Sequence, residues 1–305
     1  MELHDVKGKV DFAIITIRED ELRAILDRFP GEVVESQNRF YTLSRVPVRD
    51  GSSALVAIAR AFEQGTGEAQ TVARHIIDDL EPHWILVVGI AGGVPDFEYT
   101  LGDVVLSTRV NDLTVHAVHE TASDQFAISG GPSSYEVTKL VTALPMLESK
   151  LQGWNTRDLI GRDRPPVDWS DPESFYGDEK WQQRVLASLK HNFGPLAVSR
   201  GPVVRTGPID SSDGLIKDTK TLQQWLTLTR DALAVEMEAA GVNRAAARSG
   251  GRVYPFLSIR GLSDLVGFKR HPNWTAYACH SAAAFTLALV KSGLVKRRKE
   301  AATNP

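Results

Sequence analysis

The sequence has almost no cysteine: Cys279 is the only one in 305 residues. A single thiol excludes an internal disulfide and a cysteine-based zinc site, and it fits a reducing compartment, so we expect a cytoplasmic protein. An excess of charge of one sign is also lacking, since the formal net charge is -3 and the pI is near 6.3. We therefore expect no nucleic-acid partner, and any phosphate-binding site must be local.

Long apolar runs and a leader sequence are lacking as well. The apolar stretch at 282–290 is well short of the ~20 residues that span a bilayer. Residues 1–9 are charged and lack the apolar core of a signal peptide. These features predict a protein that has no membrane partner.

The composition that remains, 42% hydrophobic and 24% charged, is that of a globular protein. Short runs rich in β-branched residues alternate with amphipathic segments, which predicts a three-layer α/β/α fold with a mixed central sheet. We expect a single domain over 1–297, with a surface insertion or lid at 121–182, and a disordered tail at 298–305. The predicted strands are 10–17, 40–43, 46–48, 54–59, 84–88, 104–107, 197–206 and 254–259, and the main predicted helices are 19–29, 68–80, 181–192 and 274–291.

Two carboxylates, Glu236 and Glu238, mark a switch from strand to helix. Residues 232–235 have the apolar character of a strand end, and alanines recur at helical spacing after Glu238. In open α/β sheets ligands collect beyond the carboxyl ends of strands, and a helix start there favours an anion. An ionised carboxylate can accept both hydroxyls of a vicinal diol such as that of ribose. The alternative is an ordinary glutamate at a helix start.

Three other strand ends carry acidic residues or glycines. Glu21 lies in the acidic first turn of the predicted helix at 19–29, where the helix dipole alone would favour it. The Gly-Ile-Ala-Gly-Gly run at 89–93 permits close approach of backbone amides to a ligand, or is a plain tight turn, and its spacing matches neither a dinucleotide-binding nor a Walker motif. Asp264 is a candidate general acid or, alternatively, a helix cap.

Taken together and in this order, the stretches 14–26, 87–93, 235–239 and 260–264 resemble the nucleoside phosphorylase superfamily. The likeness is closest to its hydrolytic branch, the methylthioadenosine/S-adenosylhomocysteine nucleosidases and related nucleotide nucleosidases. It covers nearly the whole chain except 121–182. The resemblance implies a nucleoside phosphorylase-like fold and a homodimer, since family sites are often completed by a neighbouring subunit.

The resemblance also implies a role for each matching residue. Glu238 would bind the ribose diol with Met237 against the sugar, Asp264 would protonate the purine at N7, and Glu21 would activate the attacking water. N-glycosidic bonds break through an oxocarbenium-like transition state, and these roles supply what that chemistry needs. The other implied substrate-binding or supporting positions are Glu236, Ile90, Ala91, Gly92, Arg260, Ser263, Leu215 and Ile216. Nucleosidases often have a stacking Phe at the position of Leu215, which leaves the identity of the base open.

The nucleophile is predicted to be water. Family members that use phosphate carry an arginine just before the glycine run and another after the first strand, because a dianion needs fixed positive charge. Here Val87 precedes the run, and the first helix opens with Glu19, Asp20 and Glu21. Ile90 departs from the Ser or Thr common in nucleosidases.

Basic residues follow Asp264. The segment 267–274 is similar to a lysine-to-tryptophan stretch in family domains attached to fungal immune receptors and bacterial defence proteins, some of which act on nucleotides. Lys269 and Arg270 are therefore candidates for binding a 5′-phosphate, and a defence role is one hypothesis. A solvated charged loop is the alternative.

The predicted function is hydrolysis of a purine nucleoside or nucleotide to free base and sugar. Two alternatives stay open: a phosphate-dependent nucleoside phosphorylase, and a non-catalytic nucleotide-sensing or interaction module. No metal and no organic cofactor is predicted, since His116 and His119 lack a clear third ligand.

Overall fold

The computed structural model describes residues 3–117, 125–214, 218–247 and 251–295, and its centre is a large mixed sheet. The strand order is β11-β10-β6-β12-β5-β1-β4-β3-β2, and β9 pairs with β6. Strand β11 pairs with β5 as well as with β10, so the sheet closes on itself at this end. The strands are β1 (Phe12–Thr16), β2 (Glu32–Glu35), β3 (Phe40–Pro47), β4 (Ser53–Arg60), β5 (Trp84–Gly93), β6 (Val104–Asp112), β9 (Ser129–Pro132), β10 (Val204–Ser211), β11 (Ala234–Glu236) and β12 (Phe256–Leu265); β7 (His116–Ala117) and β8 (Gln125–Phe126) form a separate pair.

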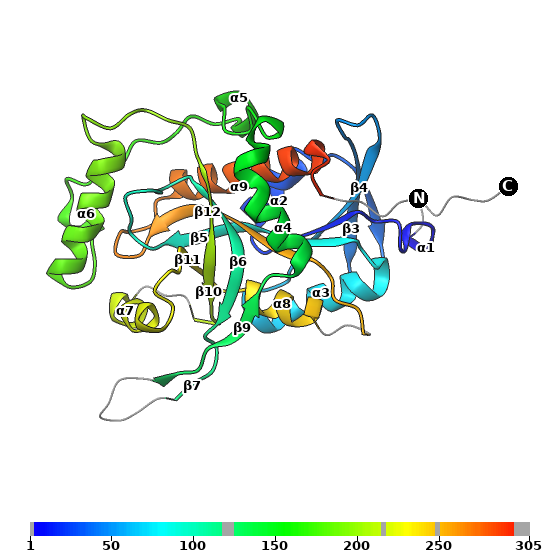
Figure 1. Ribbon diagram of the computed structural model, residues 1–305, viewed down its shortest axis with the longest axis horizontal. Coiled ribbons are helices and arrows are strands. Elements are labelled where there is room, and N and C mark those ends of the chain that lie inside the picture. The colour runs from blue at the N-terminus through cyan, green and yellow to red at the C-terminus, as the bar shows by residue number, and fades with distance from the viewer. Residues whose placement is uncertain (1–2, 118–124, 215–217, 248–250, 296–305) are drawn as a thin grey trace.

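Helices cover both faces of the sheet (Figure 1). The core on one face includes α2 (Glu19–Leu26), α4 (Tyr135–Ala143) and α9 (Pro272–Ser292), and the core on the other includes α3 (Thr66–Leu80) and α8 (Ala239–Ala247). Strand β1 shows why: alternate side chains enter opposite cores, as expected for a strand covered on both faces. The predicted three-layer α/β/α fold is confirmed. The remaining helices are α1 (Leu3–Val6), α5 (Arg157–Ile160), α6 (Glu179–Phe193) and α7 (Thr219–Leu228), with 3-10 helices at Leu144–Lys150 and Pro172–Ser174.

The glycine run lies inside a strand and not in a loop or turn after it. Strand β5 continues to Gly93 because β12 pairs with it from Phe256 to Leu265. Strand β11 adds a second neighbour at Gly92 and Gly93. The prediction that this strand ends at Val88 is therefore wrong, since partners on both sides supply the hydrogen bonds that keep the glycines extended.

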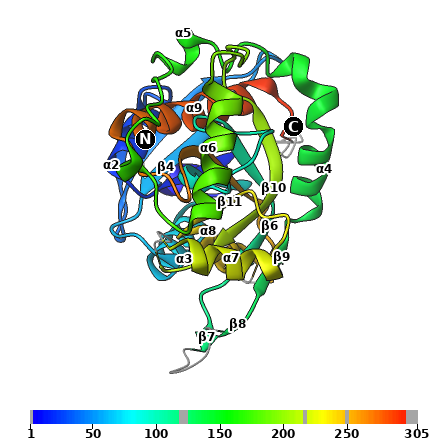
Figure 2. The same ribbon diagram turned by 90° about the vertical axis from the view of Figure 1, so that its left-hand side faces the viewer.

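Within the predicted insertion, two parts behave differently. Residues 129–143 join the core, because β9 pairs with β6 and α4 buries Val137, Leu140 and Val141. The later part leads to α6, which lies with α7 at one end of the molecule (Figure 2). There Phe175 forms a bridge with Phe268, and the amide of Tyr176 donates to the carbonyl of Gly267. This part of the insertion therefore packs against the segment that follows Asp264.

The longest helix, α9, illustrates how the apolar helices are used. Its 21 residues are buried along most of their length against β5, β6 and β12. No helix in the described part of the chain combines the length and apolar character needed to cross a membrane.

Candidate functional site

The predicted stretches meet at one pocket. Strands β1, β5 and β12 are parallel and bring their carboxyl ends to the same region, as expected for ligand sites in α/β sheets, and β11, which runs antiparallel to β5, ends there too. The pocket is lined by residues from all four stretches, which include Glu21, Ala91, Gly92, Met237, Glu238 and Asp264.

Glu21 is held in place by backbone amides. Its Oε2 accepts from the amides of Ile17 and Arg18, both at 2.9 Å, and its Oε1 accepts from the amide of Ile90 at 2.9 Å. The bond from Arg18 is half of a capping box, in which the third helical residue reaches back to the N-cap. Local sequence therefore places Glu21 at the helix start, and tertiary contact with β5 fixes its second oxygen. Because a carboxylate has about four acceptor positions, one remains for a water or a substrate.

Gly89 is required by its neighbours rather than by a ligand. A methyl group at this position would lie 2.3 Å from Oε1 of Glu21 and 2.7 Å from Nη1 of Arg260. These separations are far below contact distance, so only glycine lets the glutamate and the arginine approach β5 together.

Glu236 and Arg260 form a buried ion pair beneath the pocket. Nη2 of Arg260 donates to Oε2 of Glu236, and Nε donates to the Ser258 hydroxyl at 3.1 Å. Glu236 also accepts from the amides of Glu238 and Ala239, which are orphan donors at the start of α8. Glu236 therefore caps the helix and neutralises the arginine, and its oxygens are taken by these partners.

Of the two glutamates, Glu238 is less restrained than Glu236. It is 5% exposed, and its Oε2 lies 3.5 Å from Nη2 of Arg260, at the limit of a hydrogen bond. Burial raises the pKa of Glu238; Arg260 opposes this, and the charges of Glu236 and Glu21 raise it further. A weakly held carboxylate at the pocket wall has acceptor positions to offer a ligand, and Met237 lines the pocket beside it.

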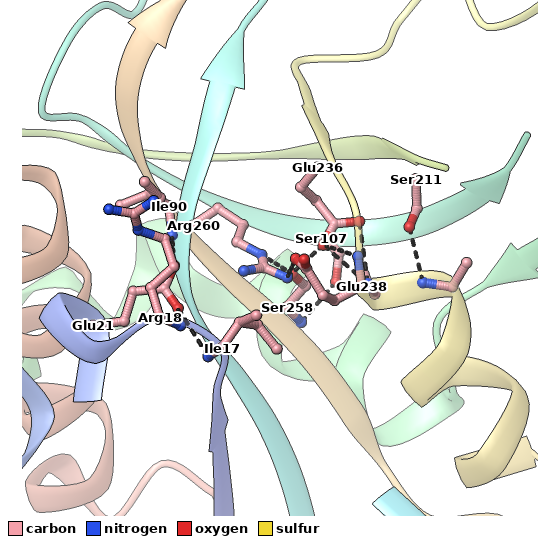
Figure 3. A network of polar contacts seen from close by, with 12 residues as sticks. Ile17, Arg18, Glu21, Ile90, Ser107, Ser211, Glu236, Glu238, Ser258 and Arg260 are labelled. Atoms are coloured by element: carbon pink, nitrogen blue, oxygen red, sulfur yellow. Dashed lines mark hydrogen bonds and ion pairs between the residues drawn. The ribbon is translucent and has the colours of Figure 1, made fainter. Parts of the chain in front are cut away.

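The buried cluster holds more negative than positive charge. Arg260 is fully buried; burial lowers its pKa, but the charges of Glu236, Glu238 and Glu21 together outweigh burial and raise it. Figure 3 shows Glu21 on one side of this network and Glu236 with Glu238 on the other. Because burial raises the pKa of Glu238 to about 8, this carboxyl group is largely neutral at pH 7. Glu21 and Glu236 remain as two carboxylates around one guanidinium, which favours a ligand that carries, or develops, positive charge.

Asp264 lies opposite, at the outer side of the pocket. Its Oδ1 accepts from the Ser263 hydroxyl at 2.6 Å and from Nε of Arg270 at 2.8 Å. Its Oδ2 faces Gly92, where an added methyl group would come within 3.3 Å. The Arg270 side chain is 34% exposed and that of Asp264 is 12% exposed. Asp264 is a residue of β12 and does not act as a helix cap, because α9 begins later and is capped by His271.

The structure brings most of the predicted site residues together. Arg260 and Ser263 lie behind the lining and support Glu236 and Asp264. Lys269 is exposed and does not belong to the lining, and its amide donates to the carbonyl of Ser174. Leu215 and Ile216 fall outside the described residues. The predicted residues that line the pocket are Glu21, Ile90, Ala91, Gly92, Glu236, Met237, Glu238, Asp264 and Arg270.

Five lining residues were not predicted: Ile17, Arg18, Gln64, Gly214 and Val235. Arg18 directly follows the first strand, which is the position that should have drawn attention to it. Gln64 and Gly214 lie after β4 and β10, so their place beyond a strand end was the available signal.

Arg18 is bound side-on by Asp20, from Nε to Oδ1 at 2.9 Å and from Nη2 to Oδ2 at 2.8 Å.

The described residues contain no cluster of three or more His, Cys, Asp or Glu that could hold a metal ion. His116 stacks on Phe126, and His119 lies outside the described residues.

The chain matches a known protein family over nearly its whole length. The family model described as "Phosphorylase superfamily" matches residues 11–291. The sequence is 26% identical over 296 residues to a "Death domain-containing ATP nucleosidase" of Amphimedon queenslandica. This alignment covers 93% of this chain and 49% of that protein. It is 24% identical over 239 residues to "ATP nucleosidase Cap17" of Escherichia coli (strain KTE188). This second alignment covers 78% of this chain and 42% of that protein. The chain thus spans about half the length of these relatives or less.

The fold is shared with a solved nucleosidase. A crystal structure of 5′-methylthioadenosine/S-adenosylhomocysteine nucleosidase from Neisseria meningitidis, in complex with methylthio-immucillin-A, aligns with a TM-score of 0.62 at 17% identity. The alignment covers 92% of this chain and 99% of that one. With a family match over nearly its whole length, the chain belongs to the phosphorylase superfamily.

Proposed function

We propose that this protein hydrolyses the N-glycosidic bond of a purine nucleoside or nucleotide, releasing the free base and the sugar. The observation that carries the proposal is the convergence of Glu21, Glu238 and Asp264 on one pocket from three separate elements. Glycosidic cleavage needs a group that holds the sugar, a group that places the nucleophile and an acid for the leaving group. The three carboxylates match these tasks.

The proposed reaction balances as follows. The bond between C1′ and N9 breaks with its electron pair going to the base, and Asp264 delivers a proton to N7. The oxygen of a water bonds to C1′, and Glu21, through its remaining acceptor position, orients that water and takes its proton. The excess of buried carboxylates around Arg260 stabilises positive charge on the ribose in the transition state.

Water is favoured over phosphate as the nucleophile. A phosphate dianion needs fixed positive charge, and Arg18, although it lines the pocket, is bound by both oxygens of Asp20. Val87, which precedes the glycine run where family members that use phosphate carry an arginine, is fully buried in the core. Glu21 would also repel an anion that approached the place proposed for the water.

The two named relatives support a nucleotide substrate, because both are called ATP nucleosidases. Their names also motivate the hypothesis of a role in defence. Cytoplasmic location and a homodimer stay predictions.

The test is base release measured by chromatography. Adenosine, inosine, methylthioadenosine, AMP and ATP are each incubated with the protein, with and without inorganic phosphate. Asp264→Asn is the blank, and Asp163→Asn, at an exposed aspartate paired with Arg157, is the matched control. Release that is independent of phosphate, lost in Asp264→Asn and retained in Asp163→Asn would support the proposal.

Two results would contradict it. Release that requires phosphate would indicate the phosphorylase, and tight binding of a purine compound without release would indicate the sensing module.

A further inference from the structure

Arg270 has one partner and spare donors. Within the described part of the chain, its bond from Nε to Asp264 is the only hydrogen bond or ion pair of its side chain. Its Nη1 and Nη2 groups are therefore not used by any described residue. An arginine that lines a pocket and offers two parallel N–H groups has the geometry to bind a phosphate in a bidentate manner.

The backbone that carries Arg270 is firmly anchored. The amide of Val266 donates to Gly93, that of Phe268 donates to Leu265, and that of Lys269 donates to Ser174. The Phe268 ring also packs on Phe175, with ring centroids 5.2 Å apart. The part of this segment that can move is therefore the Arg270 side chain. Its guanidinium is partly exposed and is held only by the bond from Nε to Asp264 among the described residues.

The present position of Arg270 conflicts with the role proposed for Asp264. A general acid must carry a proton when the base leaves. In the present position, the Asp264 carboxyl accepts a charge-assisted hydrogen bond from Nε of Arg270, so it faces the arginine as an acceptor and not the base as a donor. Hydrolysis would therefore be faster if Arg270 were drawn away from Asp264 when the substrate binds.

We propose that the 5′-phosphate of a nucleotide draws Arg270 from Asp264, so that Arg270 selects phosphorylated purine nucleosides and frees the acid only when one is bound. This inference rests on the proposed function. It makes Arg270 a specificity-determining residue that acts on both binding and turnover, because the same guanidinium recognises the phosphate and releases Asp264.

The other arginine of the pocket is less suited to this role. Arg18 is bound at two nitrogens by Asp20, whereas Arg270 is bound at one by Asp264. Moving Arg18 would also break its ion pair with Asp20 at the start of α2. A phosphate therefore displaces Arg270 more readily than Arg18.

The first experiment compares AMP and adenosine as substrates of the wild-type protein and of Arg270→Ala. We expect kcat/KM for AMP to fall about 10- to 100-fold, the usual loss for hydrogen bonds to a charged group. We expect kcat for adenosine to rise, since Asp264 is no longer held. Arg157→Ala, at an exposed arginine that also forms one ion pair with an aspartate, is the matched control and should leave both substrates unchanged.

A merely structural role for Arg270 would lower the rates for both substrates by the same factor, and that result would overturn the proposal. A ratio of AMP to adenosine turnover that is the same in wild type and variant would overturn it too. In either case base release itself would still stand.

Binding gives a second readout that does not depend on turnover. Calorimetric titration of AMP and adenosine into Asp264→Asn should show a preference for AMP, and that preference should fall about 10-fold or more in Asp264→Asn/Arg270→Ala. Equal affinities for the two compounds would contradict the inference. Loss of base release with this binding preference intact would overturn the proposed function alone.

Discussion

On the inner side of the pocket, the oxygens of Glu21 and Glu236 are occupied by backbone amides and by a buried arginine. On the outer side, Asp264 and Arg270 are joined by one ion pair near solvent. The inner arrangement cannot change without leaving a buried charge unpaired, which is costly. The outer arrangement can exchange one partner for a ligand. Under the proposed function, the inner side would stabilise the transition state in a fixed geometry, and the outer side would respond to the substrate.

The largest effect is expected on the outer side. Asp264→Asn removes the proposed acid and should lower kcat by about 10²- to 10⁴-fold, the range for a positioned proton donor. Affinity for substrate should change much less, because Glu238, the proposed ribose ligand, is untouched. Steady-state and single-turnover base release measure this, with Asp163→Asn as the control. Full activity in Asp264→Asn would mean that the acid lies elsewhere.

The next largest effect is expected from a substitution on the inner side of the pocket. Arg260→Met leaves the carboxylates of Glu21 and Glu236 buried without their cation and should lower the free energy of unfolding by about 3–5 kcal/mol, measured by urea denaturation. The double variant Arg260→Met/Glu236→Gln should recover part of this loss, because one uncompensated charge is gone. If the single variant were as stable as the wild type, the inner side would not be the rigid unit described here.

Asp210 sharpens the comparison, because it is a buried carboxylate with neutral donors where Glu236 has a cation. Burial raises the pKa of Asp210 to about 6, Asn111 and Thr229 oppose this, and Asp231 adds to it. A raised pKa means that its contribution to stability is complete below about pH 4 and is lost as pH rises through about 6. Relative to Asp210→Asn, the wild type should therefore lose on the order of 3 kcal/mol between pH 4 and pH 7.

Urea denaturation at pH 4, 5, 6 and 7 measures this difference. A difference between Asp210→Asn and the wild type that stays constant over the range would show that Asp210 does not titrate there.

The smallest of these effects concerns Gly89, which faces Glu21 and Arg260. Gly89→Ala forces Glu21 and Arg260 apart and should lower the free energy of unfolding by about 1–3 kcal/mol, as overpacking typically does. Base release should fall with it. Gly131→Ala, where an added methyl group meets no atom within 4 Å, is the matched control and should change stability by less than about 0.5 kcal/mol. Equal behaviour of the two variants would show that β5 can relax around Glu21.

Sequence patterns predicted the layers of the fold and most of the pocket. The alternation of β-branched strands and amphipathic helices was enough for the fold, because burial on two faces leaves a regular trace in the sequence. Glu21, Glu238 and Asp264 were identifiable because each lies near the carboxyl end of a predicted strand, where ligands of α/β proteins bind, and because the stretches around them resemble the nucleoside phosphorylase superfamily. The extent of strand β5 was not identifiable, since glycine has no side chain to reveal that it is paired on both sides.

By itself, the sequence determined which elements form and which charged residues stand at their ends, since these depend on local periodicity and on helix capping. Only the tertiary structure decided what each charge does. Glu236, which caps α8 through local contacts, also became an ion-pair partner because Arg260, distant in the chain, is brought beneath it. Asp264 and Arg270 became partners for a related reason: the segment between them is fixed by contacts with β5 and with the distant residue Ser174. Local rules cannot supply such pairings, because the strength of a buried charge contact depends on geometry set by the whole fold.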